Sequence, residues 1–201
     1  MVNSLDIFDG FFNRKRVLIT GHTGFKGSWL SIWLYDLGAE VIGVAQDPYT
    51  ERDNYVLSGI RRKIKADLRA DIRDGKKMKE IFQKYQPEIV FHLAAQPLVR
   101  LSYEIPVETY ETNVIGTINI LEAIRATHSV KVGIMITTDK CYENKEHIWG
   151  YHENEPLESI TKAGKMHAFK HYGFWKAMDM LKDNKELNEM WNKNKAPWKI
   201  W

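Results

Sequence analysis

Short apolar runs alternate with segments of helical periodicity along the first 137 residues. Four of the runs predict strands, at 16–20, 41–44, 89–93 and 132–137, of which 89–93 is predicted to be buried, and a weaker run predicts a strand at 63–66. Apolar residues spaced three or four positions apart predict helices at 28–37, 76–85 and 106–127. Strands that alternate with helices are typical of a parallel, doubly wound sheet, so the pattern predicts an α/β fold.

The ends of the predicted helices are marked by residues that stop a helix. Gly38 follows the first helix and is a good cap for its carboxyl end, and Gln86-Pro87 follows the second. The third helix is predicted from apolar residues at helical spacing, namely Val114, Ile118, Leu121 and Ile124.

The character of the chain changes after about residue 157. No further unit of strand, glycine turn and helix follows, and arginine is absent from residue 158 onward. Four of the seven tryptophans lie in this part, and helices are predicted at 176–180 and 185–191. We therefore expect a truncated Rossmann-type domain at 1–157 and a mostly helical C-terminal tail of different origin at 158–201.

Three glycines separate the first predicted strand from the first predicted helix. Gly21 allows a tight turn, Gly24 lets main-chain N–H groups approach a pyrophosphate, and Gly27 lets the helix pack close to the strand. This context predicts dinucleotide binding at the helix N-terminus, although a glycine-rich turn without a ligand has the same residues. The candidate cofactor contacts in this loop are Gly21, Thr23, Gly24, Phe25, Lys26 and Gly27.

Two acidic residues follow the second and third predicted strands. Asp47 lies near the place where an acidic residue holds the adenosine ribose, but it comes later than expected and is equally well explained as a turn aspartate before Pro48. Asp71 could hold the adenine amino group while Ile72 covers the ring, and a helix cap is the alternative.

Small and polar residues end the fourth and fifth predicted strands. The segment Leu93-Ala94-Ala95-Gln96 would let a flat cofactor lie against the main chain, while His92 is interpreted as a core histidine. Thr138, Asp139 and Lys140 present a hydroxyl, a carboxylate and an amine at the same edge. They are the candidate catalytic residues, and a polar loop after a strand is the alternative.

Composition narrows the class of protein. A net charge of +3 spread along 201 residues gives no argument for a nucleic-acid partner. The single cysteine, Cys141, excludes an internal disulfide framework and a cysteine-rich metal site, and it fits a reducing compartment. No signal peptide or apolar run of about 18 residues is present, so we expect a cytoplasmic protein with no membrane partner and no metal.

Several longer motifs carry a resemblance to a known family. They are GHTGFKGSWL from Gly21, AAQPLVRLSY from Ala94, ETNVIGT from Glu111 and TTDKCYEN from Thr137, continued by Trp149-Gly150-Tyr151 and Glu153-Asn154-Glu155-Pro156. Over about residues 10–157 the chain resembles the extended short-chain dehydrogenase/reductases, and among them the CDP-glucose 4,6-dehydratases.

The resemblance implies NAD as cofactor and a nucleotide-linked glucose, CDP-glucose, as substrate. A hydride would leave C4 of the sugar, water would be lost across C5 and C6, and the hydride would return to C6. By this resemblance Thr138 orients the 4-hydroxyl, Asp139 is the acid for the departing 6-hydroxyl, and Lys140 stands where sister dehydratases have a glutamate base. Self-association into a homo-oligomer is a further expectation.

The sequence departs from that family at one essential pair. Such enzymes have a Tyr-x-x-x-Lys pair about 25 residues after the threonine, where this chain has Ala163 and His167. A pair of this spacing occurs at Tyr172 and Lys176, which is too late and includes a glycine. The alternative function is therefore a catalytically inactive nucleotide-binding fusion fragment.

The tail resembles a second family. The segments GKMHAFKH from Gly164, Gly173-Phe174-Trp175, Met178-Asp179 and KAPWK from Lys195 are similar to the C-terminal end of the glucose-1-phosphate cytidylyltransferases. Their nucleotide-binding start has no counterpart in the tail, so the resemblance does not imply cytidylyl transfer.

Overall fold

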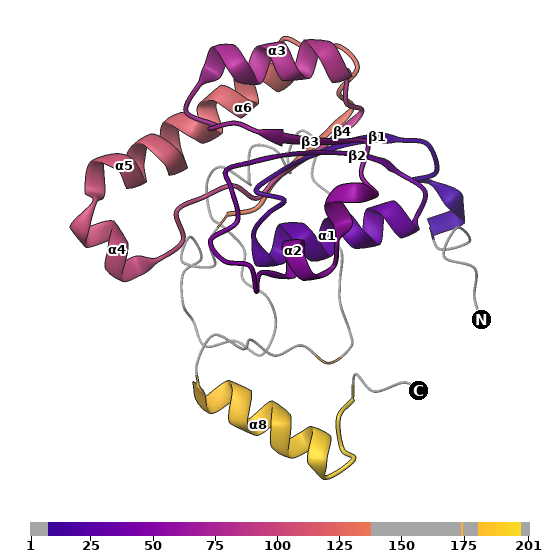
Figure 1. The fold of residues 1–201 in the computed structure, drawn as a ribbon, viewed down its shortest axis with the longest axis vertical. Helices are drawn as coiled ribbons and strands as arrows, with labels where there is room; N and C mark the ends of the chain where they lie inside the picture. The colour runs from indigo at the N-terminus through magenta and orange to yellow at the C-terminus, as the bar shows by residue number, and fades with distance from the viewer. Residues whose placement is uncertain (1–7, 138–173, 175–180, 198–201) are drawn as a thin grey trace, which may run out of the picture. The chain divides into compact units, whose positions relative to one another are not determined.

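A computed structural model describes residues 8–137, 174 and 181–197 of the chain (Figure 1). The chain divides into two compact units, Met1–Thr138 and Asp139–Trp201. In the second unit the structure describes helix α8 (Leu181–Asn192), which confirms the helix expected at 185–191. The helix expected at 176–180 and the domain boundary expected near residue 157 lie outside the described residues.

The first unit contains five parallel strands in the order β3-β2-β1-β4-β5. The central strand is β1, in which Leu18 lies opposite Ile42 of one neighbour and Val90 of the other. This order is that of a Rossmann-type sheet. From β1 the chain adds β2 and β3 on one side and then β4 and β5 on the other, and such sheets bind ligands at this switch between β1 and β4. The strands are β1 (Arg16–Thr20), β2 (Glu40–Ala45), β3 (Ala66–Arg69), β4 (Ile89–His92) and β5 (Val132–Met135).

Helices cover both faces of this sheet, which confirms the doubly wound fold. Helices α1 (Phe25–Asp36) and α2 (Asn54–Leu57) lie on one face, and α3 (Gly75–Tyr85) and α6 (Gly116–Arg125) lie on the other (Figure 1). Further helical segments of this unit are the 3₁₀ helix η2 (Ile60–Arg62), α4 (Val99–Glu104), α5 (Pro106–Tyr110) and the π-helix η3 (Glu111–Ile115).

The alternation of side chains along β1 divides the core between the two faces. Val17 and Ile19 pack with Leu34 of α1, whereas Leu18 packs with Phe82 of α3 and Ile120 of α6. Each of these side chains is at most 1% exposed. A strand buried on both faces must be apolar at every position, which is why the sequence of β1 shows no polar alternation.

The carboxyl end of α1 confirms the role expected of Gly38. The N–H of Ala39 donates to the carbonyl of Leu34, and the N–H of Gly38 donates to the carbonyl of Tyr35, at 2.9 Å each. Gly38 has a φ of +82°, the left-handed conformation that this arrangement requires and that glycine adopts at little cost.

Some element boundaries differ from those expected. Strand β3 begins at Ala66, three residues later than predicted, because its own charged residues Asp67 and Arg69 hid it from a search for apolar runs. Helix α1 begins one turn earlier, directly from the glycine loop. The single helix expected at 106–127 consists of the consecutive segments α5, η3 and α6, and α4 was not predicted.

The buried face of α6 also differs from the apolar stripe noted in the sequence. The residues of α6 that are buried in the core are Gly116, Ile120 and Ala123. Three of the four residues at helical spacing, Val114, Ile118 and Leu121, are instead 45–47% exposed, whereas the fourth, Ile124, is partly buried against the core. The long helical segment is therefore apolar on two sides, and only one of them is covered by the described part of the chain.

Candidate functional site

Two of the three loop glycines are required by the chain's own packing. Gly21 has a φ of +75°, and a Cβ there would lie 2.8 Å from the nitrogen of Ala94 at the end of β4. A Cβ at Gly27 would lie 2.1 Å from the carbonyl oxygen of Gly21. These contacts confirm the tight turn and the close helix packing expected from the sequence.

Gly24 is different, because little of the described part of the chain occupies the space in front of it. Among the described residues, a Cβ there would meet only the carbonyl oxygen of Gly21, at 3.3 Å, and Gly24 is exposed. It is the N-cap of α1, without a side-chain cap and without an acidic residue in the first turn. Within the described ranges, little therefore lies in front of the N-terminal N–H groups of α1, and such a glycine-bounded helix start is a cradle that an anionic group such as a pyrophosphate fits.

The other predicted loop residues lie around this cradle. Phe25 and Lys26 are exposed in the first turn of α1, and Phe25 is 71% exposed. Thr23 is buried, and its hydroxyl donates a hydrogen bond of 3.1 Å to the carbonyl of Gln46 after β2. The hydroxyl of Thr23 therefore ties the glycine loop to the next strand.

Thr20 connects the ends of β1 and β4. Its Oγ1 accepts hydrogen bonds of 3.2 Å from the N–H groups of Leu93 and Ala94, and it lies 2.6 Å from Nδ1 of His92. The other ring nitrogen of His92 lies 3.1 Å from Oγ1 of Thr117. Burial lowers the pKa of His92 to about 4, so this core histidine is neutral at pH 7.

The loop after β4 is held by a residue that the candidate set did not include. Oδ1 of Asn113 accepts from the N–H of Gln96 at 2.8 Å, and Nδ2 of Asn113 donates to the carbonyl of Gln96 at 3.0 Å. Asn113 lies in the π-helix η3, a type of segment that is frequent at functional sites. The sequence did single out the ETNVIGT motif, which contains Asn113, as part of the family resemblance, but it assigned no role to this residue.

Asp71 and Ile72 follow β3 at the same edge of the sheet. The Asp71 carboxylate accepts hydrogen bonds from Arg73 and from Nε2 of Gln46, and the bonds from Arg73 hold its pKa below the ordinary value. Ile72 is 4% exposed and packs in the core, where a Cβ on Gly116 would lie 2.5 Å from its Cδ1. The Ile72 side chain is thus committed to the core, whereas the Asp71 carboxylate is partly accessible.

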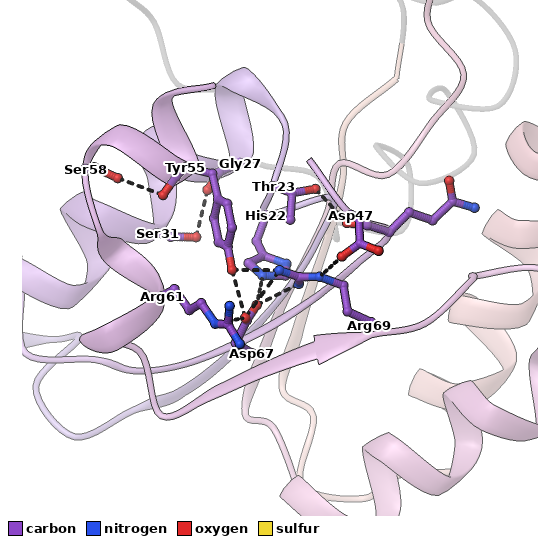
Figure 2. A network of polar contacts seen from close by, with 11 residues as sticks. His22, Thr23, Gly27, Ser31, Asp47, Tyr55, Ser58, Arg61, Asp67 and Arg69 are labelled. Atoms are coloured by element: carbon purple, nitrogen blue, oxygen red, sulfur yellow. Dashed lines mark hydrogen bonds and ion pairs between the residues drawn. The ribbon is translucent and has the colours of Figure 1, made fainter. Parts of the chain in front are cut away.

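A buried polar network lies beneath the glycine loop (Figure 2). Nε2 of His22 and the hydroxyl of Tyr55 both donate to the carboxylate of Asp67, at 2.7 Å each. Burial lowers the pKa of His22, and Asp67 opposes this only in part. The His22 ring is fully buried, and it fits only because residue 43 is glycine, where a Cβ would lie 2.4 Å from the ring.

Arg69 extends this network to Asp47 (Figure 2). Its Nη1 donates to Asp67 and its Nε donates to Asp47, at 2.7 Å each, while Nη2 donates to the Tyr55 hydroxyl at 2.8 Å. Burial would lower the pKa of Arg69, but these acceptors together raise it above the ordinary value. Asp47 is therefore an ion-paired residue, and its side chain is still 85% exposed.

The three candidate catalytic residues, Thr138, Asp139 and Lys140, lie outside the described residues, as do Tyr172 and Lys176. The structure does bring the loop glycines together with Ala94, and it places Asp47 and Asp71 along the same carboxyl edge of the sheet. In the described ranges no three His, Cys, Asp or Glu residues are grouped so that they could hold a metal ion. None of the helices that the structure describes is long and apolar enough to cross a membrane.

Comparison with known proteins gives matches of two kinds. The family model described as GDP-mannose 4,6 dehydratase matches residues 18–181. The CDP-glucose 4,6-dehydratase of Salmonella typhimurium is 50% identical over 147 residues, which are 73% of this chain and 41% of that enzyme. The probable glucose-1-phosphate cytidylyltransferase of Bacillus subtilis is 45% identical over 49 residues, 24% of this chain and 19% of that protein. Both resemblances drawn from the motifs are thus confirmed.

Solved structures show the same fold. The UDP-glucose 4-epimerase of Thermus thermophilus, in complex with NAD, superimposes with a TM-score of 0.55 and 31% identity over 74% of this chain and 48% of that one. The chain spans about two fifths of the length of the dehydratase that it matches.

Proposed function

This chain belongs to the family described as GDP-mannose 4,6 dehydratase, and from that premise we propose that its first unit binds NAD at the carboxyl edge of the sheet. The supporting observation is Gly24, the loop glycine that the chain's own packing needs least and that opens onto the N-terminus of α1. The pyrophosphate lies there in this proposal, with the adenosine toward Asp47 and Asp71 and the nicotinamide toward Ala94 and Ala95.

The proposed substrate is a nucleotide-linked glucose, and specifically CDP-glucose. The support is the 50% identity with the CDP-glucose 4,6-dehydratase of Salmonella typhimurium. When bound, NAD supplies the acceptor for a hydride from C4 of the sugar. In this proposal Thr138 orients the 4-hydroxyl, Asp139 protonates the departing 6-hydroxyl, and Lys140 lies beside the C5 proton.

A second function, nucleotide binding without turnover, is favoured by one observation. Ala163 and His167 occupy the places where the family's catalytic Tyr-x-x-x-Lys pair would fall. Neither side chain reproduces a tyrosine base whose pKa is lowered by a lysine one helical turn later. The two functions share the NAD site and differ only in the chemical step.

Calorimetric titration with NAD tests the site that both functions share. Purified protein is titrated to millimolar NAD and compared with Gly24→Ala and Gly24→Val. We expect affinity to fall in proportion to the size of the added side chain, while the unfolding temperature stays close to that of the original chain. An absence of binding by the folded original chain refutes the proposal, and so does equal binding by Gly24→Val.

A homo-oligomer is proposed from the exposed apolar face of the helical segment from Pro106 to Arg125. Val114, Ile118 and Leu121 lie on this face. A hollow of about 370 Å³ at its N-terminal end is lined by Pro106, Val107, Tyr110, Glu111, Val114 and Ile115. The proposed occupant is the same face of a second copy, packed antiparallel about a two-fold axis.

The charges at the ends of this segment support an antiparallel pairing. Glu111 and Arg125 lie seven residues before and seven residues after Ile118. An antiparallel partner centred on Ile118 therefore brings each glutamate next to an arginine of the other copy, whereas a parallel partner would place like charges together.

A further inference from the structure

His22 places a titratable ring in the protein interior, directly behind the glycine loop. The side chain is fully buried, whereas the other titratable side chain of this loop, Lys26, is exposed. The main chain of His22 lies against the first turn of α1, because a Cβ on Gly27 would be 2.8 Å from the Cα of His22. The ring reaches β2, where a Cβ on Gly43 would lie 2.4 Å from it. A charge on this ring would therefore stand behind the start of α1 and out of contact with water.

The His22 ring has room for one more proton. Its Nε2 donates to Asp67 at 2.7 Å, while Nδ1 is buried and has no hydrogen-bond partner in the described part of the chain. Asp67 and the main-chain carbonyl of Val44 both favour the protonated ring, but burial outweighs them and lowers the pKa of His22. Without a ligand the ring is therefore neutral at pH 7, and its Nδ1 is an unsatisfied buried acceptor.

The charges around His22 balance as long as its ring is neutral (Figure 2). The residues of β2 against the ring, Gly43 and Val44, carry no titratable group. Titratable side chains face the ring from two other elements: Asp67 and Arg69 of β3, and Tyr55 of α2. Arg61 is paired with Asp67 at 3.2 Å, and Asp47 is paired with Arg69 at 2.7 Å. Two carboxylates thus meet two guanidinium groups, and a proton on His22 would give this network a net charge of one.

We propose that His22 is a proton-linked positioning residue for the dinucleotide, whose ring takes up a proton at Nδ1 when the pyrophosphate binds at the start of α1. This inference rests on the proposed dinucleotide site and adds a residue that holds the ligand through the loop. The proton comes from the solvent, and no other bond is made or broken. The pyrophosphate carries two negative charges that do not titrate near neutral pH. Their attraction for a buried imidazolium is stronger than it would be in water, so it offsets the burial that keeps the ring neutral in the free chain.

The test is calorimetric titration of the original chain with NAD at several pH values. Binding and protonation must favour each other equally, since linkage is reciprocal. We therefore expect NAD affinity to rise at least threefold as the pH is lowered from about 7.5 to 5.5, because each unit of increase in the pKa of His22 adds up to a factor of ten. Titrations at one pH in buffers of different ionisation enthalpy count the protons taken up for each NAD bound.

His22→Gln is the variant that identifies the group, because glutamine retains a donor for Asp67 but cannot take up a proton. We expect it to bind NAD without proton uptake and with an affinity that does not change over this pH range. His92→Gln is the matched control. His92 is also buried, but both of its ring nitrogens have partners, Thr20 and Thr117, so this variant should retain the proton uptake.

Tyr55→Phe supplies a second measurement that does not depend on the folding of His22→Gln. It removes the hydroxyl that donates to Asp67 at 2.7 Å, so the carboxylate becomes a stronger acceptor for the imidazolium of His22. The rise in NAD affinity should then move to higher pH.

Three results overturn this inference alone and leave the proposed function intact. They are NAD binding by the original chain without proton uptake, proton uptake that persists in His22→Gln, and a rise in affinity at an unchanged pH in Tyr55→Phe. An absence of NAD binding by the folded original chain at every pH overturns both the inference and the proposed function.

Discussion

Gly21 and Ala94 are in direct main-chain contact across the sheet: a Cβ at Gly21 would lie 2.8 Å from the nitrogen of Ala94. The two residues are 73 positions apart in the chain and lie just beyond the ends of the neighbouring strands β1 and β4. Thr20 reinforces the contact, because its hydroxyl oxygen accepts hydrogen bonds from the N–H groups of Leu93 and Ala94. The glycine loop and the end of β4 therefore form one continuous surface at the point where the strand order reverses.

Gly21→Ala is expected to destabilise the protein by at least about 2 kcal/mol. The substitution adds a Cβ at a positive φ and places it against main-chain atoms that cannot rotate away. Urea unfolding of the two proteins measures the difference. Gly24→Ala is the matched control, with an expected cost below about 1 kcal/mol, since its Cβ meets a single atom of the described residues, at 3.3 Å. Equal costs for the two variants would contradict this interpretation of the loop.

The stability of the protein is expected to fall as the pH drops from about 6.5 toward 4. The pKa of His92 is lowered from 6.5 to about 4 by burial, so the unfolded chain binds a proton that the folded chain excludes. The neutral His92 imidazole therefore makes its full contribution to the free energy of unfolding above pH 6.5. This contribution, on the order of 3 kcal/mol, is lost as the pH falls from 6.5 to 4. His22, whose pKa is also lowered, changes in the same direction.

Urea unfolding at several pH values between 4 and 7 measures this slope, with about 0.5 pH units between points. His92→Gln is expected to be less stable than the original chain at pH 7 but to show a flatter dependence on pH. His128→Gln is the control, because the His128 side chain is exposed. An unchanged slope in His92→Gln would show that the buried imidazole is not the group responsible.

Most of the sheet could be predicted because β1, β2 and β4 are buried on both faces and must be apolar throughout. Strand β3 was placed three residues too early because its charged residues, Asp67 and Arg69, satisfy each other within the fold, and hydropathy does not register such pairs. Periodicity identified the helix containing Ile118 but not its buried side, since that segment has apolar residues on two faces and only the partner surface decides between them.

The candidate site was predictable to a similar extent. Local spacing alone identified the loop glycines, because a strand, a tight turn and a helix start are encoded by adjacent residues. The network that joins His22 and Asp67 could not be derived in this way, since its members are 45 positions apart and meet only through the sheet. Asn113 was missed for the same reason: its contact is with the main chain of Gln96, which carries no side-chain signature.

Asn113→Ala is expected to release the loop after β4 and to cost about 1 to 2 kcal/mol, because it removes both hydrogen bonds to the main chain of Gln96. The sharper measurement is hydrogen exchange at the Gln96 amide, which should lose its protection. Asn113→Asp is the control, since it retains the acceptor for that amide and loses only the donor. Fast exchange in Asn113→Asp equal to that in Asn113→Ala would mean that Oδ1 is not the group protecting it.

Ile118→Arg is expected to convert the proposed homo-oligomer to a monomer. The side chain is 47% exposed, so the fold tolerates the change, but two arginines would meet at the centre of the two-fold contact. Sedimentation velocity at several protein concentrations reports the change. Leu57→Arg, at an apolar position on α2 that is 72% exposed, should leave association unaltered. A monomeric original chain would refute the proposed pairing.

The purified chain is expected to dehydrate CDP-glucose far more slowly than a complete dehydratase does. Oxidation at C4 needs a base for the hydroxyl proton. The hydroxyl of Thr138 cannot serve, because it is too weakly acidic to lose its own proton first. Asp139 and Lys140 are assigned by resemblance to the C5 and C6 side of the sugar, away from that proton. The loss of a positioned general base typically reduces the rate by about 10² to 10⁴-fold. Formation of the 4-keto product, followed by its absorbance in alkali, measures the turnover. Turnover equal to that of a complete enzyme would contradict the prediction, and its disappearance in Tyr172→Phe but not in Thr138→Ala would identify Tyr172 as the base.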